Sequence, residues 1–286
     1  MPNPVLTKLS ERPAERAAPP VSPEELQRMY DQPSYQAPAP PGAVPPLDLK
    51  RYGGGGGDGS QPTRYMTLDD VVVRTGAMLA VIFIAGAVTW SLGPTSTGSG
   101  GLIALGLIGG LALGLYMAFT MRATAVTSLA YSAFEGLLLG GISRAFNDRY
   151  PGIVVQAVTG TMLVALGMLV VYRSGAIRVT PRFTRVVIGA TIGAVALMFV
   201  NLLVSLFVHG GLGLRDAQDH LWLAVGFSAL CIVIAAFNLV LDFDMIEQCI
   251  KRGVDERFAW FAAFGLMVTL IWLYIEMLRL IGYLRD

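Results

Sequence analysis

Three acidic residues lie inside long apolar stretches of the sequence, at positions where an ionisable side chain needs an explanation. They are Glu135, Asp242 and Glu276. An acid at the centre of a membrane-spanning helix costs about 2.5–3.5 kcal/mol on insertion scales, so it is usually retained for a function or a partner. The chemistry open to such a group is to bind a proton reversibly or to attract a cation within a polar cavity.

Asp242 is the strongest candidate because a second polar residue extends its helix face. Asn238 precedes it by four residues and therefore shares that face. Asp244 lies about 200° further around the same helix, so Asp242 and Asp244 cannot both face one pore. We expect Asp242 to face the bundle interior, whereas we interpret Asp244 and Glu247 as residues of a solvated helix end. A solvated helix end is also the alternative for Asp242.

Two arginines near the expected cytoplasmic ends of helices, Arg74 and Arg122, could each pair with Asp242. An arginine beside a carboxylate favours its ionised form, and protonation of the carboxylate then releases the pair. Such a pair would act as a pH-sensitive latch. The alternative is an arginine whose side chain extends to the lipid headgroups, and we favour this alternative for Arg74.

The other two acids each have a functional and a structural interpretation. Glu135 is followed by Gly136 and Gly140, and small residues let a neighbouring helix approach closely. Glu135 is then either an ion- or proton-responsive group in a polar cavity or a protonated carboxyl bonded to the neighbouring helix. Glu276 and Arg279 are three residues apart on one helix and can form a local pair.

No arrangement of residues points to an enzyme, a metal centre or a cofactor site. The sequence contains none of the motifs H-E-x-x-H, G-x-S-x-G or a phosphate-binding Walker loop. Its two cysteines, Cys231 and Cys249, do not have metal-ligand spacing, and both histidines fall in one loop. The formal net charge of +1 gives no bulk attraction to nucleic acid.

The elements that would hold these residues are seven apolar helices. The chain is 54% hydrophobic and 14% charged, whereas a soluble domain carries about 25% charged residues. About 20 apolar residues are needed to cross a bilayer. We therefore predict an all-α integral membrane protein whose residues 66–286 form a seven-transmembrane-helix bundle. The expected helices cover about 71–92, 101–121, 124–146, 151–172, 186–208, 221–247 and 258–284.

Two prolines give expectations about helix boundaries. Pro151 suits the first position of the fourth helix, because its missing N–H is not needed there. The pair Thr180-Pro181 is expected to break the chain before the fifth helix begins at about 186.

The N-terminal stretch is expected to be a disordered cytoplasmic tail covering residues 1–65. It is rich in proline, ends in the glycine run 53–57 and lacks an apolar segment of a signal peptide. The basic residues of the short loops indicate the orientation, because Lys and Arg favour the cytoplasmic side. They concentrate in 173–185 and 251–257. We therefore expect a multi-pass protein of the plasma (inner) membrane, with its N-terminus inside and its C-terminus outside.

Four segments of the chain together resemble the Bax inhibitor-1 family. They are Tyr131 to Gly140, Tyr150 to Ala157, Asn238 to Glu247 and Leu273 to Leu280, and the opening Asn3 to Leu6 is similar to a bacterial branch of that family. The resemblance implies seven helices with the last one central. It also implies a calcium leak regulated by pH, through an aspartate pair on the sixth and seventh helices and an arginine latch.

The family's functional residues carry over onto this sequence only in part. The aspartate of the sixth helix corresponds to Asp242, or to Asp244 if the register slips, and Arg122 is the latch candidate by position. The partner on the seventh helix falls at Thr269, where this sequence has no acid. Either the two-acid sensor is absent, or Glu276 or Glu135 replaces the missing acid.

Three functions remain open at this level. The first is a pH-modulated cation leak channel that passes calcium or protons along a path lined by Glu135 and Asp242. The second is a non-conducting membrane regulator that binds a membrane protease or another membrane protein. The third is a proton-coupled transporter, which would favour inverted repeats, and the sequence shows no convincing internal repeat.

Overall fold

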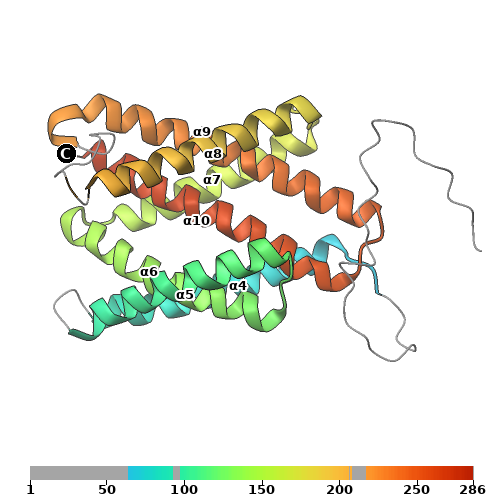
Figure 1. Cartoon of the computed structure of the whole chain (residues 1–286), viewed down its shortest axis with the longest axis horizontal. Coiled ribbons are helices and arrows are strands. Elements are labelled where there is room, and N and C mark those ends of the chain that lie inside the picture. The colour runs from blue at the N-terminus through green and yellow to red at the C-terminus, as the bar shows by residue number, and fades with distance from the viewer. Residues whose placement is uncertain (1–63, 93–96, 206, 208–216, 286) are drawn as a thin grey trace, which may run out of the picture. The chain divides into compact units, whose positions relative to one another are not determined.

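The computed structural model describes residues 64–92, 97–205, 207 and 217–285 (Figure 1). The predicted disordered tail lies outside the described residues, apart from its last two positions. Within the described residues, seven helices are long and apolar enough to cross a membrane, which confirms the all-α, multi-pass prediction. Their bounds are α4 Leu68–Leu92, α5 Thr97–Thr120, α6 Ala125–Arg149, α7 Ile153–Arg173, α8 Pro181–Ser205, α9 Ala217–Lys251 and α10 Ala259–Tyr283.

The two prolines behave differently from the prediction. Pro151 is not the first helical residue of α7. The chain turns there, Gly152 has φ +81° and α7 begins at Ile153. Asn147 fixes this turn, because its side-chain oxygen accepts the N–H of Gly152 at 2.9 Å. Pro181, in contrast, is the first residue of α8 and starts it five residues earlier than expected, since a proline at this position leaves no helical hydrogen bond unmade.

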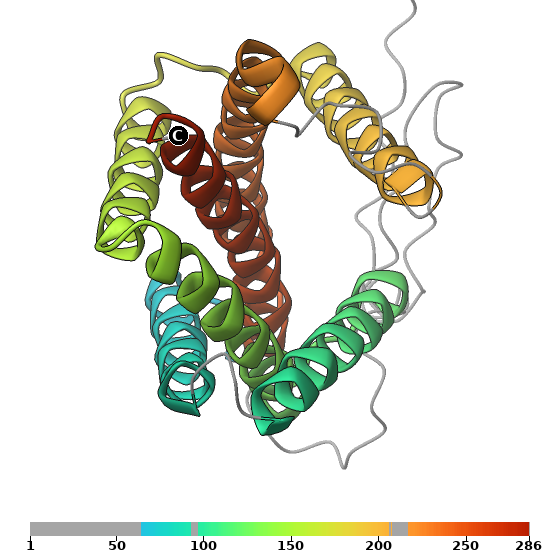
Figure 2. The same ribbon diagram turned by 90° about the vertical axis from the view of Figure 1, so that its left-hand side faces the viewer.

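The last helix, α10, occupies the centre of the bundle. It packs against α9, α7, α4 and α6, and its buried residues are distributed around its circumference. Figure 2 shows the ribbon of α10, in dark red, with α4 (cyan), α6 (green) and α7 (yellow-green) on one side and α9 (orange) on the other. The outermost helices are α5, which packs mainly on α6, and α8, which packs on α9. The central position of the last helix agrees with what the family resemblance implied.

Glycine contacts hold α6 close to α4 and α5. A Cβ added at Gly140 would clash with the backbone of Gly86 in α4, and one added at Gly136 would lie 2.6 Å from the carbonyl oxygen of Ile82. On the opposite side, a Cβ at Gly106 of α5 would lie 2.6 Å from the carbonyl oxygen of Phe134. Close backbone approach of this kind maximises van der Waals contact where no hydrophobic force drives helices together.

The segment just before α4 is attached to the connection between α9 and α10. The N–H of Met66 donates to the carbonyl of Val254 at 2.8 Å, and the N–H of Glu256 donates to the carbonyl of Arg64 at 3.0 Å. The side chain of Met66 is buried in a cluster with Ile246 and Ala259. Residues 64–66 therefore form a strap across the end of the bundle at which α9 ends and α10 begins.

Candidate functional site

Asp242 meets α10 at the residue where the family resemblance placed a second acid. The hydroxyl of Thr269 donates to Oδ2 of Asp242 at 2.7 Å, and the carbonyl of Gly265 lies 3.3 Å from the same hydroxyl. Thr269 is buried, and Asp242 is half-buried. Both residues lie nine or ten positions from the ends of their helices at the α9–α10 connection, which corresponds to roughly 14 Å along a helix axis.

A second polar contact joins the same two helices nearer their other ends. Glu276 of α10 is 1% exposed, and its carboxylate accepts from the hydroxyl of Ser228 of α9 at 3.1 Å. The guanidinium of Arg279 pairs with the other carboxylate oxygen at 3.0 Å. The local Glu276–Arg279 pair predicted from the sequence is therefore confirmed.

Apolar side chains separate these two polar contacts. Ala235 and Leu239 of α9 form one buried cluster with Leu270 and Leu273 of α10. Leu239 and Leu273 are fully buried, so the buried core of this cluster consists of hydrocarbon between the level of Asp242 and the level of Glu276. The described α9–α10 interface thus has two polar contacts at different levels, with packed hydrocarbon between them.

Neither arginine proposed as a latch pairs with Asp242 in the structure. The guanidinium of Arg74 instead donates to the backbone carbonyl of Glu256 and lies 5.3 Å from the ring centre of Trp260. The strap formed by residues 64–66 brings the α9–α10 connection over the start of α4, so Arg74 finds its partners there. Arg122 is exposed at the junction of α5 and α6. The described conformation therefore contains neither of the two possible latch pairs.

The remaining polar residues of α9 point to other helices. The amide of Asn238 donates to the hydroxyl of Thr191 in α8 at 2.7 Å, so it bridges α9 to α8 and does not extend the Asp242 contact. Asp244 accepts from Gln248 at 2.5 Å, and the hydroxyl of Tyr172 in α7 donates to Glu247. Asp242 and Asp244 face different neighbours, as their angular separation predicted.

Glu135 belongs to a different interface. Its carboxylate lies against Gly110 of α5, where an added Cβ would approach Oε1 to 3.0 Å, and it interacts with the hydroxyl of Tyr131 one turn earlier. The structure therefore brings Asp242 together with Thr269, and Glu276 with Ser228 and Arg279, but places Glu135 in a third position between α5 and α6.

The oxygen atoms at Asp242 suit a transient cation or a proton better than a stably held metal. The contact supplies one carboxylate and one hydroxyl, whereas calcium in proteins takes six to eight oxygen ligands. Among the residues that the structure describes, no group of three or more His, Cys, Asp or Glu side chains could hold a metal ion. A cation at Asp242 would have to keep most of its water ligands.

Three partner residues were missed by sequence reasoning. Ser228 precedes Asp242 by fourteen residues, or nearly four helical turns, so it shares the Asp242 face and this spacing was a usable signal. Thr269 was treated only as a missing acid, although a threonine hydroxyl is a hydrogen-bond donor in its own right. Nothing in the sequence singles out Thr191, because its partner Asn238 is 47 residues away.

The model of a family described as Bax inhibitor 1 like matches residues 3–286. None of the individually curated proteins matches the chain.

Proposed function

We propose that this chain, which belongs to the Bax inhibitor 1 like family, is a cation leak protein of a cell membrane whose flux depends on the protonation of Asp242. The observation that carries the proposal is the Asp242–Thr269 contact, a carboxylate held by a neutral donor within the membrane-spanning part of the bundle. Calcium is the expected permeant ion, in line with the family resemblance.

The neutral partner determines the expected direction of the pH effect. If an arginine held Asp242, protonation would release the pair and loosen the bundle. Thr269 has no charge, so protonation of Asp242 releases no ion pair and simply removes a negative charge that attracts cations. We therefore expect the leak to fall as the pH is lowered.

In this proposal, the apolar cluster between the two polar contacts closes the cation pathway. A hydrated cation cannot pass between Leu239 and Leu270 while these side chains are packed together. Hydrophobic constrictions of this type gate channels by excluding water. Opening then requires α9 and α10 to separate at this level, with Asp242 and Glu276 on either side of the constriction.

The test is calcium entry into liposomes that contain the full chain and a trapped indicator dye, measured between mildly acidic and neutral pH. Wild type should show a flux above that of empty liposomes, and the flux should fall with pH. Asp242→Asn should abolish the pH dependence. Asp244→Asn is the matched control on the same helix and should retain it, because Asp244 bonds Gln248 of its own helix and Tyr172 of α7, and not α10.

Absence of flux above empty liposomes, with folded protein, would contradict the leak function. The alternative would then be a non-conducting regulator that binds a membrane protease or another membrane protein. In that case the packed apolar section of the α9–α10 interface would stay closed, and the polar contacts on either side of it would be structural. Deletion of residues 1–60 would abolish partner binding by a tail-dependent regulator, but would leave a leak through the bundle intact.

A further inference from the structure

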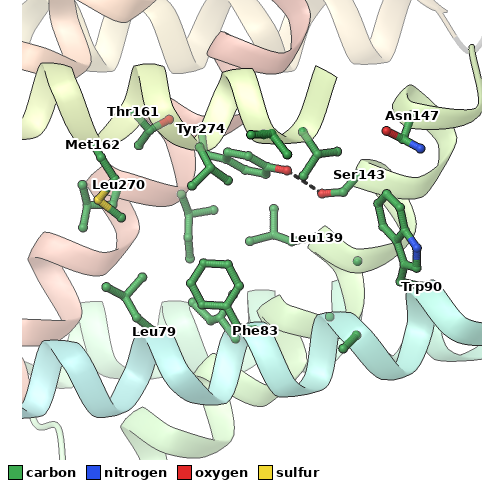
Figure 3. Close-up of a pocket in the computed structure, with 18 of the residues that line it drawn as sticks. Leu79, Phe83, Trp90, Leu139, Ser143, Asn147, Thr161, Met162, Leu270 and Tyr274 are labelled. Carbon is green, nitrogen blue, oxygen red and sulfur yellow. Dashed lines mark hydrogen bonds between the residues drawn. The ribbon is translucent and has the colours of Figure 1, made fainter. Parts of the chain in front are cut away.

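A cavity of about 490 Å³ lies between α4, α6, α7 and α10, away from the Asp242 contact (Figure 3). Its walls are almost entirely hydrocarbon. The hydroxyl groups in the lining already have partners: the hydroxyls of Ser143 and Tyr274 are 2.6 Å apart, and Thr161 donates to the carbonyl of Ala157 at 2.8 Å. The cavity therefore suits an apolar ligand.

The cavity opens between α4 and α7, on the surface that faces the bilayer. Both helices line it, and both pack on α6 and α10 to form its other walls. At the opening, Phe83 of α4 is 58% exposed and Val155 of α7 is 71% exposed. Both residues lie within membrane-spanning helices, so their exposed surface meets lipid and not water.

One end of the cavity carries the features of a membrane interface. Trp90 and Asn147 lie at the same end in Figure 3. The guanidinium of Arg144 lies 5.6 Å from the centre of the Trp90 ring and donates to the Trp90 carbonyl at 3.0 Å. Tryptophan and arginine are common at the depth of lipid headgroups. This end is also the end of the bundle that carries the α6–α7 connection.

We propose that this cavity binds one acyl chain of a bilayer phospholipid, which enters between α4 and α7 with its headgroup near Trp90 and Arg144. Water does not fill a cavity whose polar groups are already paired. An empty cavity would leave its lining side chains without packing partners on one side. Phospholipid chains are present at high concentration at the opening and have the required chemistry.

The proposed site also borders the apolar cluster that separates the two polar contacts of α9 and α10. Leu270 lines the cavity and belongs to the apolar cluster with Leu239 that separates the two polar contacts. A bound acyl chain would thus contact Leu270, a side chain of that cluster. The binding site itself does not depend on the proposed leak, because it follows from the cavity and its opening alone.

The experiment is photo-crosslinking of the full chain in nanodiscs made with a phosphatidylcholine that carries a diazirine at the end of one acyl chain. Labelled residues are then located by peptide mass spectrometry. We expect label on the buried lining residues Thr161, Met267 and Leu270, which lipid on the outer surface of the bundle cannot reach. Thr161 and Leu270 lie away from the Trp90 end of the cavity (Figure 3). Label confined to outward-facing residues such as Ile84 and Leu163 would overturn the proposal.

Two variants with a matched design add a second readout. Val158→Phe fills the cavity from α7 and should abolish interior labelling. Val170→Phe makes the same change at a lipid-exposed position of α7 outside the cavity and should leave labelling unchanged. Equal labelling of both variants would contradict the proposal, and the wild-type map decides alone if Val158→Phe does not fold. Interior labelling by a free fatty acid bearing the same diazirine, but not by the phospholipid, would also overturn it.

Discussion

The hydroxyl of Thr269 donates to the carboxylate of Asp242 at 2.7 Å across the interface of α9 and α10. A second carboxylate at this position could approach Asp242 only if the two acids shared a proton, because like charges in contact cannot both be ionised. A threonine imposes no such condition. In this chain Asp242 can therefore carry its charge while it remains bonded to the central helix.

Removal of the Thr269 donor should destabilise the bundle. Thr269→Val preserves the side-chain shape but leaves Asp242 without this hydrogen bond, and an unsatisfied buried polar group costs about 1–3 kcal/mol. The thermal unfolding of purified protein in detergent measures the effect. Thr159→Val is the control, because Thr159 is exposed on α7 and bonds only its own helix backbone, at Val155. Equal effects of the two variants would contradict the importance of the Asp242 contact.

A methyl group added at the α4–α6 contact should also be destabilising. Gly140→Ala places a Cβ against the backbone of Gly86, which cannot move aside as a flexible side chain would. Overpacking of this kind typically costs about 1–3 kcal/mol. Gly167→Ala on α7 has no atom near the added Cβ, so it should leave thermal stability unchanged or slightly raised. A tolerated Gly140→Ala would show that α4 and α6 do not pack as closely as described.

The buried Glu276 should depend on Arg279 for its stabilising effect. Glu276→Gln removes a charge-assisted hydrogen bond, and we expect a loss of about 1.5–3 kcal/mol. The double variant Glu276→Gln/Arg279→Gln should recover part of this loss, since it leaves no unpaired charge. Glu247→Gln provides the surface comparison, because the Glu247–Lys251 pair is largely exposed and should contribute about 0.2–1 kcal/mol. If the losses of stability caused by Glu276→Gln and by Arg279→Gln alone simply added in the double variant, the coupling between these two residues would be disproved.

We expect Arg74 to stabilise the strap formed by residues 64–66 and not to interact with the carboxylate of Asp242. Arg74→Met removes both the donation to Glu256 and the contact with Trp260, and the cation–aromatic contact alone is worth about 0.5–1 kcal/mol. Trypsin should then cleave faster after Arg64, which is exposed at the edge of the strap. Arg122→Met should leave this cleavage unchanged. If Arg122→Met alone altered the pH dependence of calcium flux, the latch at Arg122 would be restored as a hypothesis.

The sequence was sufficient for the helices because their signal is local. A run of about 20 apolar residues between polar breaks needs no knowledge of neighbours, and the Glu276–Arg279 pair depends only on helical spacing. The boundaries at Pro151 and Pro181 differed from expectation since a proline fits both a turn and a first helical position. After Pro151 the chain forms the turn, because the side chain of Asn147 accepts the N–H of Gly152.

The partners of the polar residues were harder to predict because they depend on which helices are neighbours. Asn238 and Asp242 share a face by spacing, yet one bonds α8 and the other α10, since α9 lies between these two helices. Arg74 was expected near Asp242 only because both residues were assigned to the cytoplasmic ends of their helices. Its true partners follow from the strap at residues 64–66, whose backbone pairing with the α9–α10 connection leaves no pattern in the sequence.

The central position of the last helix has a consequence for how the protein is made. During synthesis α4, α5 and α6 leave the ribosome long before α10, so they must persist in the membrane without the helix that later fills the core. Their mutual contacts rely on glycines at Gly86, Gly136 and Gly106, and none of these contacts involves α10. The three helices can thus assemble first as an independent unit. A nascent chain that stops between residues 149 and 259 would retain this unit but lack α10, which packs more extensively on α7 and α9 than the unit itself does.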